Sequence, residues 1–414
     1  MQRPDQSPAL ARVMRGELCA GCGACAAIAP GKVSMAVAEP GYLRPVQSAP
    51  LDPAEETAIR NACPGLGVKV AAEGRENPVL WGPHISMQTG WAADEGLRFA
   101  GSSGGALSAV LVHLLAADVV DAVVQTTASP VLAIGNSSVV STDAAAITAA
   151  AGSRYAPSSP LADLTTRLAS GRRHAFVGKP CDAAALRAMA AADPKVAASF
   201  PVILSFFCAG VPSHAGGQAV LEALGVQPSE VARFRYRGMG WPGRATATLK
   251  DGTERSMSYH DSWGKILSRH VQLRCKICPD GVGMTADIVC ADAWESDAQG
   301  YPRFAEAPGI SLIVARTPLG AQILAAATAA GHLHIAPFDI ATLAGIQPGQ
   351  RLRKRSTLAR LLALRLAGRP VPDYQGMQLK AAARQNPLST NLRNFLGMLR
   401  RLPRKGQLRI DPPS

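Results

Sequence analysis

The feature that most constrains this chain is a run of closely spaced cysteines near its start. Three of them follow one another with two residues between neighbours, and a fourth comes later, directly before a proline; they are Cys19, Cys22, Cys25 and Cys63. Three thiolates at this spacing wrap a tight loop around the corners of an iron–sulfur cubane, and a remote Cys-Pro supplies the fourth ligand. The glycines between them let backbone amides approach the sulfides. The pattern therefore predicts a 4Fe–4S cluster.

We expect this segment to hold one cluster, and zinc and free cysteines are the two alternatives to it. In the bacterial ferredoxin run, a fourth Cys-Pro serves a second cluster, but here Ala29-Pro30 occupies that position, so we expect one cluster in this segment. Zinc usually binds two separated pairs of cysteines and not an evenly spaced trio, and free cysteines are the remaining alternative. We favour the cluster.

The rest of the sequence fits a reducing compartment. Nine cysteines are too few for a disulfide scaffold in 414 residues, and the chain opens with no apolar export segment. The longest uncharged apolar stretch, Gly105–Ala117, is interrupted by His113 and is too short to span a bilayer. We expect a cytoplasmic protein whose clustered cysteines bind metal.

The middle of the chain alternates apolar strand-like runs with helical stretches. The expected strands are Asp121–Thr126, His174–Gly178, Pro201–Phe207, Asp287–Cys290 and Ser311–Ala315, and the expected helices are Cys181–Ala192, Ala215–Leu224 and Leu319–Ala330. This alternation predicts an α/β fold with a mostly parallel sheet. Arg244–Leu249 and Thr253–Tyr259 flank Asp251-Gly252 and predict a β-hairpin insertion. We expect a ferredoxin-like iron–sulfur module over residues 1–75, a flavin and second-cluster domain over 76–350, and a basic helical tail over 351–414.

A second set of cysteines lies in this middle part. Cys181 and Cys208 each follow an expected strand, so both should lie at the carboxyl end of the sheet, where ligands bind in open α/β folds. Cys275 and Cys278 add a pair with two residues between them. We expect these four to hold a second 4Fe–4S cluster. Cys290 is a fifth thiol within an apolar run, and it is either core packing or an alternative ligand.

Two short loops suggest a flavin site. Ser102, Ser103, Gly104 and Gly105 lead into an apolar helix, Ala106–Leu115, whose N-terminus can face a phosphate or a flavin edge. In the other loop, Ser153 precedes Arg154, which could pair with a phosphate, and Tyr155, which could stack on a ring. The glycines at 238, 240 and 243 match a dinucleotide fingerprint in letters only, since the expected hairpin and not a helix follows them.

Taken together, these motifs resemble the family of the coenzyme F420 hydrogenase and dehydrogenase beta subunits, whose relatives include 7-hydroxymethyl chlorophyll a reductase and ferredoxin-dependent divinyl chlorophyllide reductase. The resemblance extends over residues 18–374. Besides the cysteines and the two loops, it is carried by Gly178-Lys179-Pro180, Phe207 with Ala209-Gly210, Pro279-Asp280, Ala286-Asp287-Ile288 and Asp292-Ala293-Trp294. It implies FAD, one or two 4Fe–4S clusters, and a site where a carrier or substrate meets the flavin. It also supports assigning the Ser102–Gly105 loop and Arg154 to FAD.

We therefore expect an oxidoreductase that passes electrons between a ferredoxin-type or deazaflavin carrier and an organic substrate. Lys179 and His214 stand near expected strand ends and are the candidate catalytic proton donors. The alternative is a non-catalytic electron-transfer subunit or redox sensor that works with a partner chain.

The formal charge of +13 belongs to the end of the chain. From Arg351 to Ser414 there are 15 Lys and Arg against 2 Asp and Glu, so the remaining residues are neutral overall. Thr357–Leu366 and a helix beginning near Ser389 are basic and amphipathic. They suit an anionic membrane surface or an acidic partner such as ferredoxin, and not nucleic acid, because stacking aromatics are few. Alternatively, both helices pack their apolar faces on the body.

Overall fold

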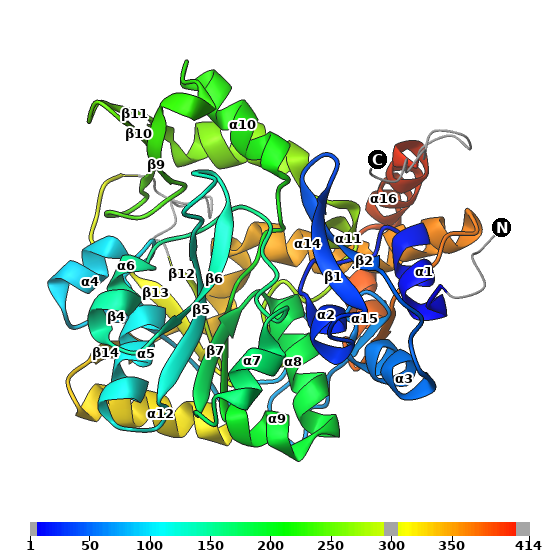
Figure 1. Cartoon of the computed structure of the whole chain (residues 1–414), viewed down its shortest axis with the longest axis horizontal. Coiled ribbons are helices and arrows are strands. Elements are labelled where there is room, and N and C mark those ends of the chain that lie inside the picture. The colour runs from blue at the N-terminus through cyan, green and yellow to red at the C-terminus, as the bar shows by residue number, and fades with distance from the viewer. Residues whose placement is uncertain (1–5, 294–304, 403–414) are drawn as a thin grey trace.

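The computed structural model describes residues 6–293 and 305–402, and Figure 1 traces their course. Trp294, which belongs to one motif of the family resemblance, and the final twelve residues of the basic tail lie outside the described residues. Among the described residues, no helix combines the length and apolar character that crossing a membrane requires.

An eight-stranded sheet forms the centre of the molecule. Its order is β14 (Leu333–Pro337), β4 (Ser86–Ala92), β13 (Ser311–Ala315), β12 (Ile288–Asp292), β8 (Val202–Phe206), β7 (His174–Gly178), β5 (Ala122–Ala128) and β6 (Asn136–Ser141). The strands β12, β8, β7 and β5 pair in parallel. Because β4 and β12 are both antiparallel to β13, five strands run the same way, and β13, β14 and β6 oppose them.

Helices cover both faces of this sheet. One face carries α4 (Glu95–Ala100), α5 (Ala106–Ala116), α6 (Ala144–Ala149) and α12 (Pro318–Ala329), and the other carries α7 (Leu164–Ala169), α8 (Pro180–Ala192) and α9 (Pro194–Ser199). Successive strand residues serve the two cores in turn: Phe176 packs with α8, whereas Val177 packs with α5. Burial on both faces explains why these strands are continuous apolar runs in the sequence.

A smaller three-stranded sheet forms a separate layer, and Figure 1 shows it at the top of the molecule beside α10. Its strands are β9 (Val231–Arg235), β10 (Arg244–Leu249) and β11 (Glu254–Ser258), accompanied by α10 (His214–Ala223), the 3₁₀ turns η1 (Pro228–Glu230) and η3 (Leu267–His270), and the π-helical turn η2 (His260–Ile266). β10 and β11 pair as the predicted hairpin. The outer strand β9 was not predicted, because Val231–Arg235 carries two arginines and reads as a loop.

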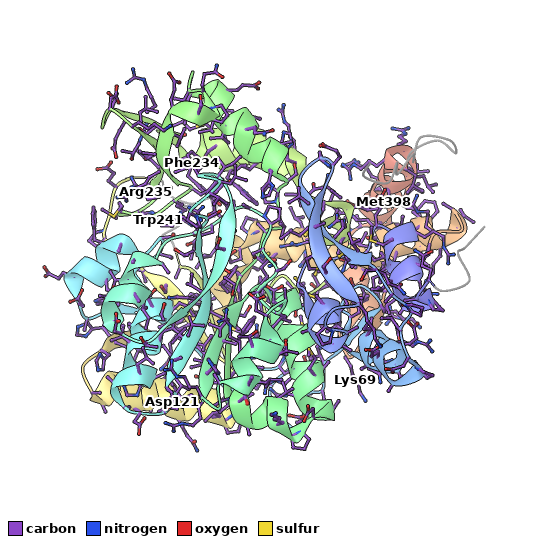
Figure 2. The ribbon with its side chains drawn as sticks, viewed as in Figure 1. Lys69, Asp121, Phe234, Arg235, Trp241 and Met398 are labelled. Atoms are coloured by element: carbon purple, nitrogen blue, oxygen red, sulfur yellow. The ribbon has the colours of Figure 1, made fainter. Side chains whose placement is uncertain are left out.

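The two ends of the chain build one region together (Figure 1). It contains α1 (Pro8–Arg15), α2 (Ala24–Ile28), β1 (Val33–Ala38), β2 (Tyr42–Gln47), α3 (Pro53–Ala62), β3 (Gly67–Lys69), α11 (Leu273–Lys276), α14 (Pro348–Leu366), β15 (Asp373–Gln375), α15 (Leu379–Arg384) and α16 (Leu388–Arg401). The short elements η4 (Ile340–Thr342) and α13 (Leu343–Ile346) precede α14 and pack on the core of the large sheet. β3 pairs in parallel with β15. Leu18, Ile277, Leu364 and Met398 share one core, and Figure 2 labels Met398 on α16. The expected boundary at residue 350 therefore falls inside α14, a helix whose inner face is buried.

Candidate functional site

The first cysteine set surrounds one small cavity. Cys19 and Cys22 lie in the loop before α2, Cys25 lies in its first turn, and Cys63 caps the end of α3; all four line the cavity. The loop between them needs glycine, because Gly23 has φ +88° and an added Cβ would stand 2.6 Å from the backbone nitrogen of Ala162. Helix and loop geometry thus bring all four cysteines to the lining of one cavity.

These four thiols influence one another electrostatically. Burial raises the pKa of Cys22 well above its ordinary value, and the thiols of Cys63 and Cys25 raise it further. Burial also raises the pKa of Cys25 to about 12 and that of Cys63 to about 11, and Cys19 contributes to both. Without a bound group these thiols stay protonated at neutral pH, so binding as thiolates has to displace protons.

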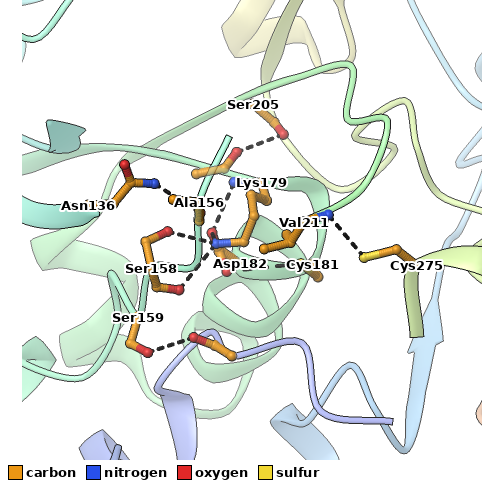
Figure 3. Close-up of polar contacts among 12 residues, drawn as sticks. Asn136, Ala156, Ser158, Ser159, Lys179, Cys181, Asp182, Ser205, Val211 and Cys275 are labelled. Atoms are coloured by element: carbon orange, nitrogen blue, oxygen red, sulfur yellow. Dashed lines mark hydrogen bonds and ion pairs between the residues drawn. The ribbon is translucent and has the colours of Figure 1, made fainter. Parts of the chain in front are cut away.

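The second cysteine set comes together from three separate segments. Cys181 lies in the first turn of α8, Cys208 follows β8, and Cys275 and Cys278 lie in and just after α11. Burial raises the pKa of Cys208 to about 12, and Cys275 and Cys278 raise it as neighbours. The sulfur of Cys275 accepts hydrogen bonds from the backbone N–H of Val211 at 3.4 Å (Figure 3) and from Gln272 at 3.6 Å. The four predicted positions are therefore brought together.

Cys290, the fifth thiol, lines the same large cavity as Cys208 and Cys275 but differs from them in its electrostatic surroundings. It lies in β12, and burial alone raises its pKa to about 12, whereas Cys181 and Cys208 each respond to other thiols. Its environment fits a core residue.

We expect Cys290→Ala to keep the full iron content of the wild-type protein, because no other thiol acts on this one. Iron analysis of anaerobically purified protein checks this, with Cys208→Ala as the matched variant that loses iron. Loss of iron in Cys290→Ala to the level of Cys208→Ala would assign Cys290 as a ligand.

The donor chemistry of both sets fits a cluster. Within residues 6–293 and 305–402, no group of three or more His, Cys, Asp or Glu side chains is arranged to hold a single metal ion. An iron–sulfur cluster instead takes one thiolate at each of several irons, which spaces its ligands more widely than a single ion does. Each set offers four thiols, which is the number and type of donor that a 4Fe–4S cluster takes.

A large cavity of about 770 Å³ joins the two loops predicted to bind flavin. Ser102 and Ser153 both line it, and the Ser102 hydroxyl oxygen accepts hydrogen bonds from the Ser153 backbone N–H at 2.6 Å and from the Ser153 hydroxyl at 2.8 Å. Ser103 and Gly105 also line the cavity, whereas Gly104 packs against Gly309 and does not. The cavity has the size expected of a cofactor site.

Arg154 and Tyr155 also face this cavity, in different ways. Arg154 donates to Asn136 Oδ1 at 3.0 Å and to the carbonyls of Phe234 at 2.8 Å and Gly135 at 2.6 Å. Most of its donors therefore hold its own loop in place. Tyr155 packs against Trp263, with ring centroids 4.8 Å apart. Trp263 projects from the π-helical turn η2, a kind of distortion that is frequent at functional sites.

Sequence reasoning missed Arg237 as a site residue. It lines the cavity, is only 2% exposed, and pairs with Asp292 at 2.8 Å. Its Nε donates to the carbonyl of Pro242, but its Nη2 has no hydrogen-bond partner among the described residues. An unpartnered buried donor needs an acceptor, and the pyrimidine or phosphate oxygens of a flavin nucleotide provide one. The only sequence signal for the Arg237–Asp292 ion pair was that Asp292 belongs to one of the motifs of the family resemblance.

The two candidate proton donors lie in different places. Lys179 lines the cavity, forms a 2.7 Å ion pair with Asp182 and donates to the Ser158 hydroxyl at 3.0 Å, as Figure 3 shows. His214 begins α10 instead, and its backbone N–H donates to the carbonyl of Gly41. It lies outside the lining of the cavity.

Three cations line the cavity close to the second cysteine set, since Lys276 follows Cys275 and Arg353 donates to the carbonyl of Cys208. The three are Lys276, Arg353 and Arg360, and none of them forms an ion pair within the described residues. Burial lowers the pKa of Arg360 to about 10, with Arg401 and Arg353 adding to the effect. A group of like charges without a counter-charge favours a negatively charged occupant.

Comparison with known proteins shows which family this chain belongs to. Two family models match, both for the beta subunit of coenzyme F420 hydrogenase/dehydrogenase: the model of its N-terminal part matches residues 87–165, and the model of its C-terminal part matches residues 171–340. Together the two matches span more than half of the chain. The chain belongs to the coenzyme F420 hydrogenase/dehydrogenase beta subunit family. The matched ranges contain both flavin loops and the second cysteine set, whereas the first cysteine set lies before them.

A solved structure shows the same fold for this family member. It is a chain of the F420-reducing [NiFe] hydrogenase complex from Methanosarcina barkeri, studied after xenon derivatization, with 20% sequence identity and a TM-score of 0.51. The alignment covers 68% of this chain and 96% of that chain. No curated protein matches the sequence.

Proposed function

We propose that this family member is an iron–sulfur flavoprotein oxidoreductase, which passes electrons between a ferredoxin-type or deazaflavin carrier and an organic substrate through 4Fe–4S clusters and FAD. The observation that carries the proposal is the shared cavity. Cys208 and Cys275 of the second cysteine set line the same 770 Å³ space as Ser102 and Ser153 of the flavin loops. A cluster held by the second set would therefore adjoin a flavin held by the loops.

The residues between the two cysteine sets support an electron path. Asp182 contributes to raising the pKa of both Cys22 and Cys181, after burial, so this one carboxyl group lies near a thiol of each set. The loop around Ser159 ties the two regions together, because its hydroxyl donates to the carbonyl of Gly21 at 2.7 Å. Cys208 and Cys275 line the cavity, whereas the four cysteines of the first set are absent from its lining, so the proposed path runs from the first set through the second set to the cavity.

Within the cavity, the chain's own residues bind and orient. A bound flavin supplies the exchange of one and two electrons. The Nη2 of Arg237 has no partner among the described residues and can donate to an acceptor on a bound group. Tyr155 and Trp263 can pack their rings against it. Lys179 lines the cavity and carries a positive charge and a proton that it can donate. Lys276, Arg353 and Arg360 favour an anionic substrate or carrier.

A second candidate function is that of an electron-transfer subunit or redox sensor with a partner chain. The similar solved structure belongs to a hydrogenase complex. On α16, Leu388, Leu392 and Leu396 form an exposed stripe at intervals of four residues, and Leu388 is 87% exposed. An apolar stripe flanked by arginines suits a protein partner or an anionic membrane surface.

Anaerobic reduction with ferredoxin, followed by a screen of deazaflavin and tetrapyrrole acceptors, distinguishes the two candidates. Turnover of an acceptor supports the enzyme, and reduced clusters without turnover of any acceptor support the subunit. A colourless protein that contains zinc would contradict both.

We expect Arg237→Gln to lower the FAD content of the purified protein at least tenfold. The amide can still donate to Asp292, but it leaves no donor at the place of Nη2, and a charge-assisted hydrogen bond of this kind contributes about 1.5–3 kcal/mol. Absorbance of the flavin and its release on denaturation measure the content. Arg235→Gln, two residues earlier at the end of β9 and outside the cavity lining, is the matched control. Equal flavin in both variants would remove Arg237 from the site.

A further inference from the structure

Arg274 is a buried cation that lies between the two cysteine sets. It belongs to α11, directly before Cys275, and is only 2% exposed. Its Nη2 donates to the carbonyl of Pro64 at 2.7 Å, and Pro64 directly follows Cys63. One end of the side chain is therefore anchored in the second set and the other end touches the backbone of the first.

The charge of Arg274 acts on thiols of both sets. It counters, in part, the effect by which burial raises the pKa of Cys19 and of Cys63. The thiols of Cys278, Cys181 and Cys275, together with Tyr374, in turn raise the pKa of Arg274 against the lowering effect of burial. Both sets thus lie within electrostatic range of one guanidinium.

The protein itself does not neutralise this cation. Its Nε and Nη1 have no hydrogen-bond partner, and it forms no ion pair with a carboxylate among the described residues; its guanidinium carbon lies 5.5 Å from the ring centre of Tyr374. Arg316, which is also fully buried and also lacks an ion pair among the described residues, has both of its Nη atoms satisfied by the carbonyls of Trp81, Pro83 and Val282, and only its Nε is without a partner. A buried and unpaired charge is costly unless a negative group stands nearby. Arg274 thus has the environment of a counter-charge whose anions are supplied at the two cysteine sets.

We propose that Arg274 is the shared counter-charge of the two clusters and raises the reduction potential of both. This inference rests on the proposed function, because it requires clusters at both sets. Reduction adds one electron from the carrier to a cluster and makes it more negative by one charge. The guanidinium keeps its protons, so it stabilises the reduced form of either cluster by attraction alone and no bond is made or broken.

Potentiometric titration followed by electron paramagnetic resonance tests the proposal on the full chain. In Arg274→Met, both clusters should become harder to reduce by at least tenfold in the equilibrium constant, which is about 59 mV for a one-electron couple. Arg274→Lys keeps the charge and should leave both potentials within about half of that shift. Arg172→Met removes one positive charge from an exposed position and is the control that should change neither.

Three results would overturn the proposal. The first is that both reduction potentials are unchanged in Arg274→Met. The second is that the reduction potential of only one cluster changes. The third is that the potentials fall as far in Arg274→Lys as in Arg274→Met, which would assign the effect to packing. If Arg274→Met fails to assemble clusters, the unfolding temperatures of the cluster-free variant and the cluster-free wild type are compared. The counter-charge role predicts that the cluster-free variant unfolds at the same or a higher temperature than the cluster-free wild type, and a lower temperature would show a structural role. Absence of clusters from the wild type would instead contradict the proposed function itself.

Discussion

Replacing both Cys208 and Cys275 by alanine is expected to remove about half of the bound iron, or about four of eight atoms, while the first cluster stays in place. The two thiols come from separate segments and meet at the wall of the large cavity, so no other residue of the set can compensate for their loss. The remaining iron should no longer pass electrons to the flavin, because the adjoining group is missing. Iron and sulfide analysis, with the rate of flavin reduction, measures the change.

The complementary variant is Cys22→Ala with Cys63→Ala, which should remove the other half of the iron. Comparing the two double variants distinguishes loss of one cluster from general misfolding, because each variant retains one intact cysteine set. Full iron content in the Cys208 and Cys275 variant would mean that the second set does not bind a cluster.

Ending the chain after Gly349 is expected to abolish the folded protein. This deletion removes α14, in which Thr357 and Leu364 are fully buried, and with it the core that the N-terminal segment shares through Leu18. Losing several fully buried aliphatic side chains costs about 2–5 kcal/mol for each one, which exceeds the stability of most domains when summed. Solubility, circular dichroism and cofactor content report the outcome. A folded, cofactor-loaded product would show that α14 is a separate docking element.

The exposed arginines of α16 can be tested without this disruption. Reversing the charge of Arg393, Arg400 and Arg401 to glutamate should leave the unfolding temperature within a few degrees, because surface substitutions change stability by less than about 0.5 kcal/mol each. It should weaken binding to ferredoxin or to anionic vesicles at low salt, and added salt should weaken wild-type binding similarly. Unchanged binding to both would leave α16 as a packed and solvated helix.

The parts of this fold that local sequence determines were predicted well. The bounds of β7 and β13 agree with the prediction because their residues are buried on both sides and form clean apolar runs. The edge and flanking strands β4, β6 and β14 were missed, since their polar and glycine residues weaken any single periodicity and only pairing with neighbours stabilises them. The two cysteine sets could be grouped from the sequence, the first by its spacing and the second by a spaced pair together with two cysteines that follow strands, and their role as ligands stays a prediction.

The polar contacts of the candidate site could not be predicted from the sequence, because they depend on tertiary structure. Ser102 and Ser153 were each expected at a flavin, but only the fold shows that they bond to each other. Arg237 and Arg274 carry no local signal, because a buried arginine reads like a surface arginine until its surroundings are known. The basic tail was assigned to a separate segment because of its charge, and charge does not reveal that one face of α14 is buried against the rest of the protein.

The pairing of β3 with β15 also has a consequence for how the protein is made. Residues 67–69 leave the ribosome about three hundred residues before their partner strand at 373–375. At about 5–20 residues per second, that interval lasts roughly 15–60 s. During this time the first four cysteines lack the C-terminal helices that bury their surroundings, and they are open to oxygen and to competing metals. Cys19 shares its core with Leu364, Val371 and Met398. We therefore expect the surroundings of the first cysteine set to close only after α14, β15 and α16 have been made.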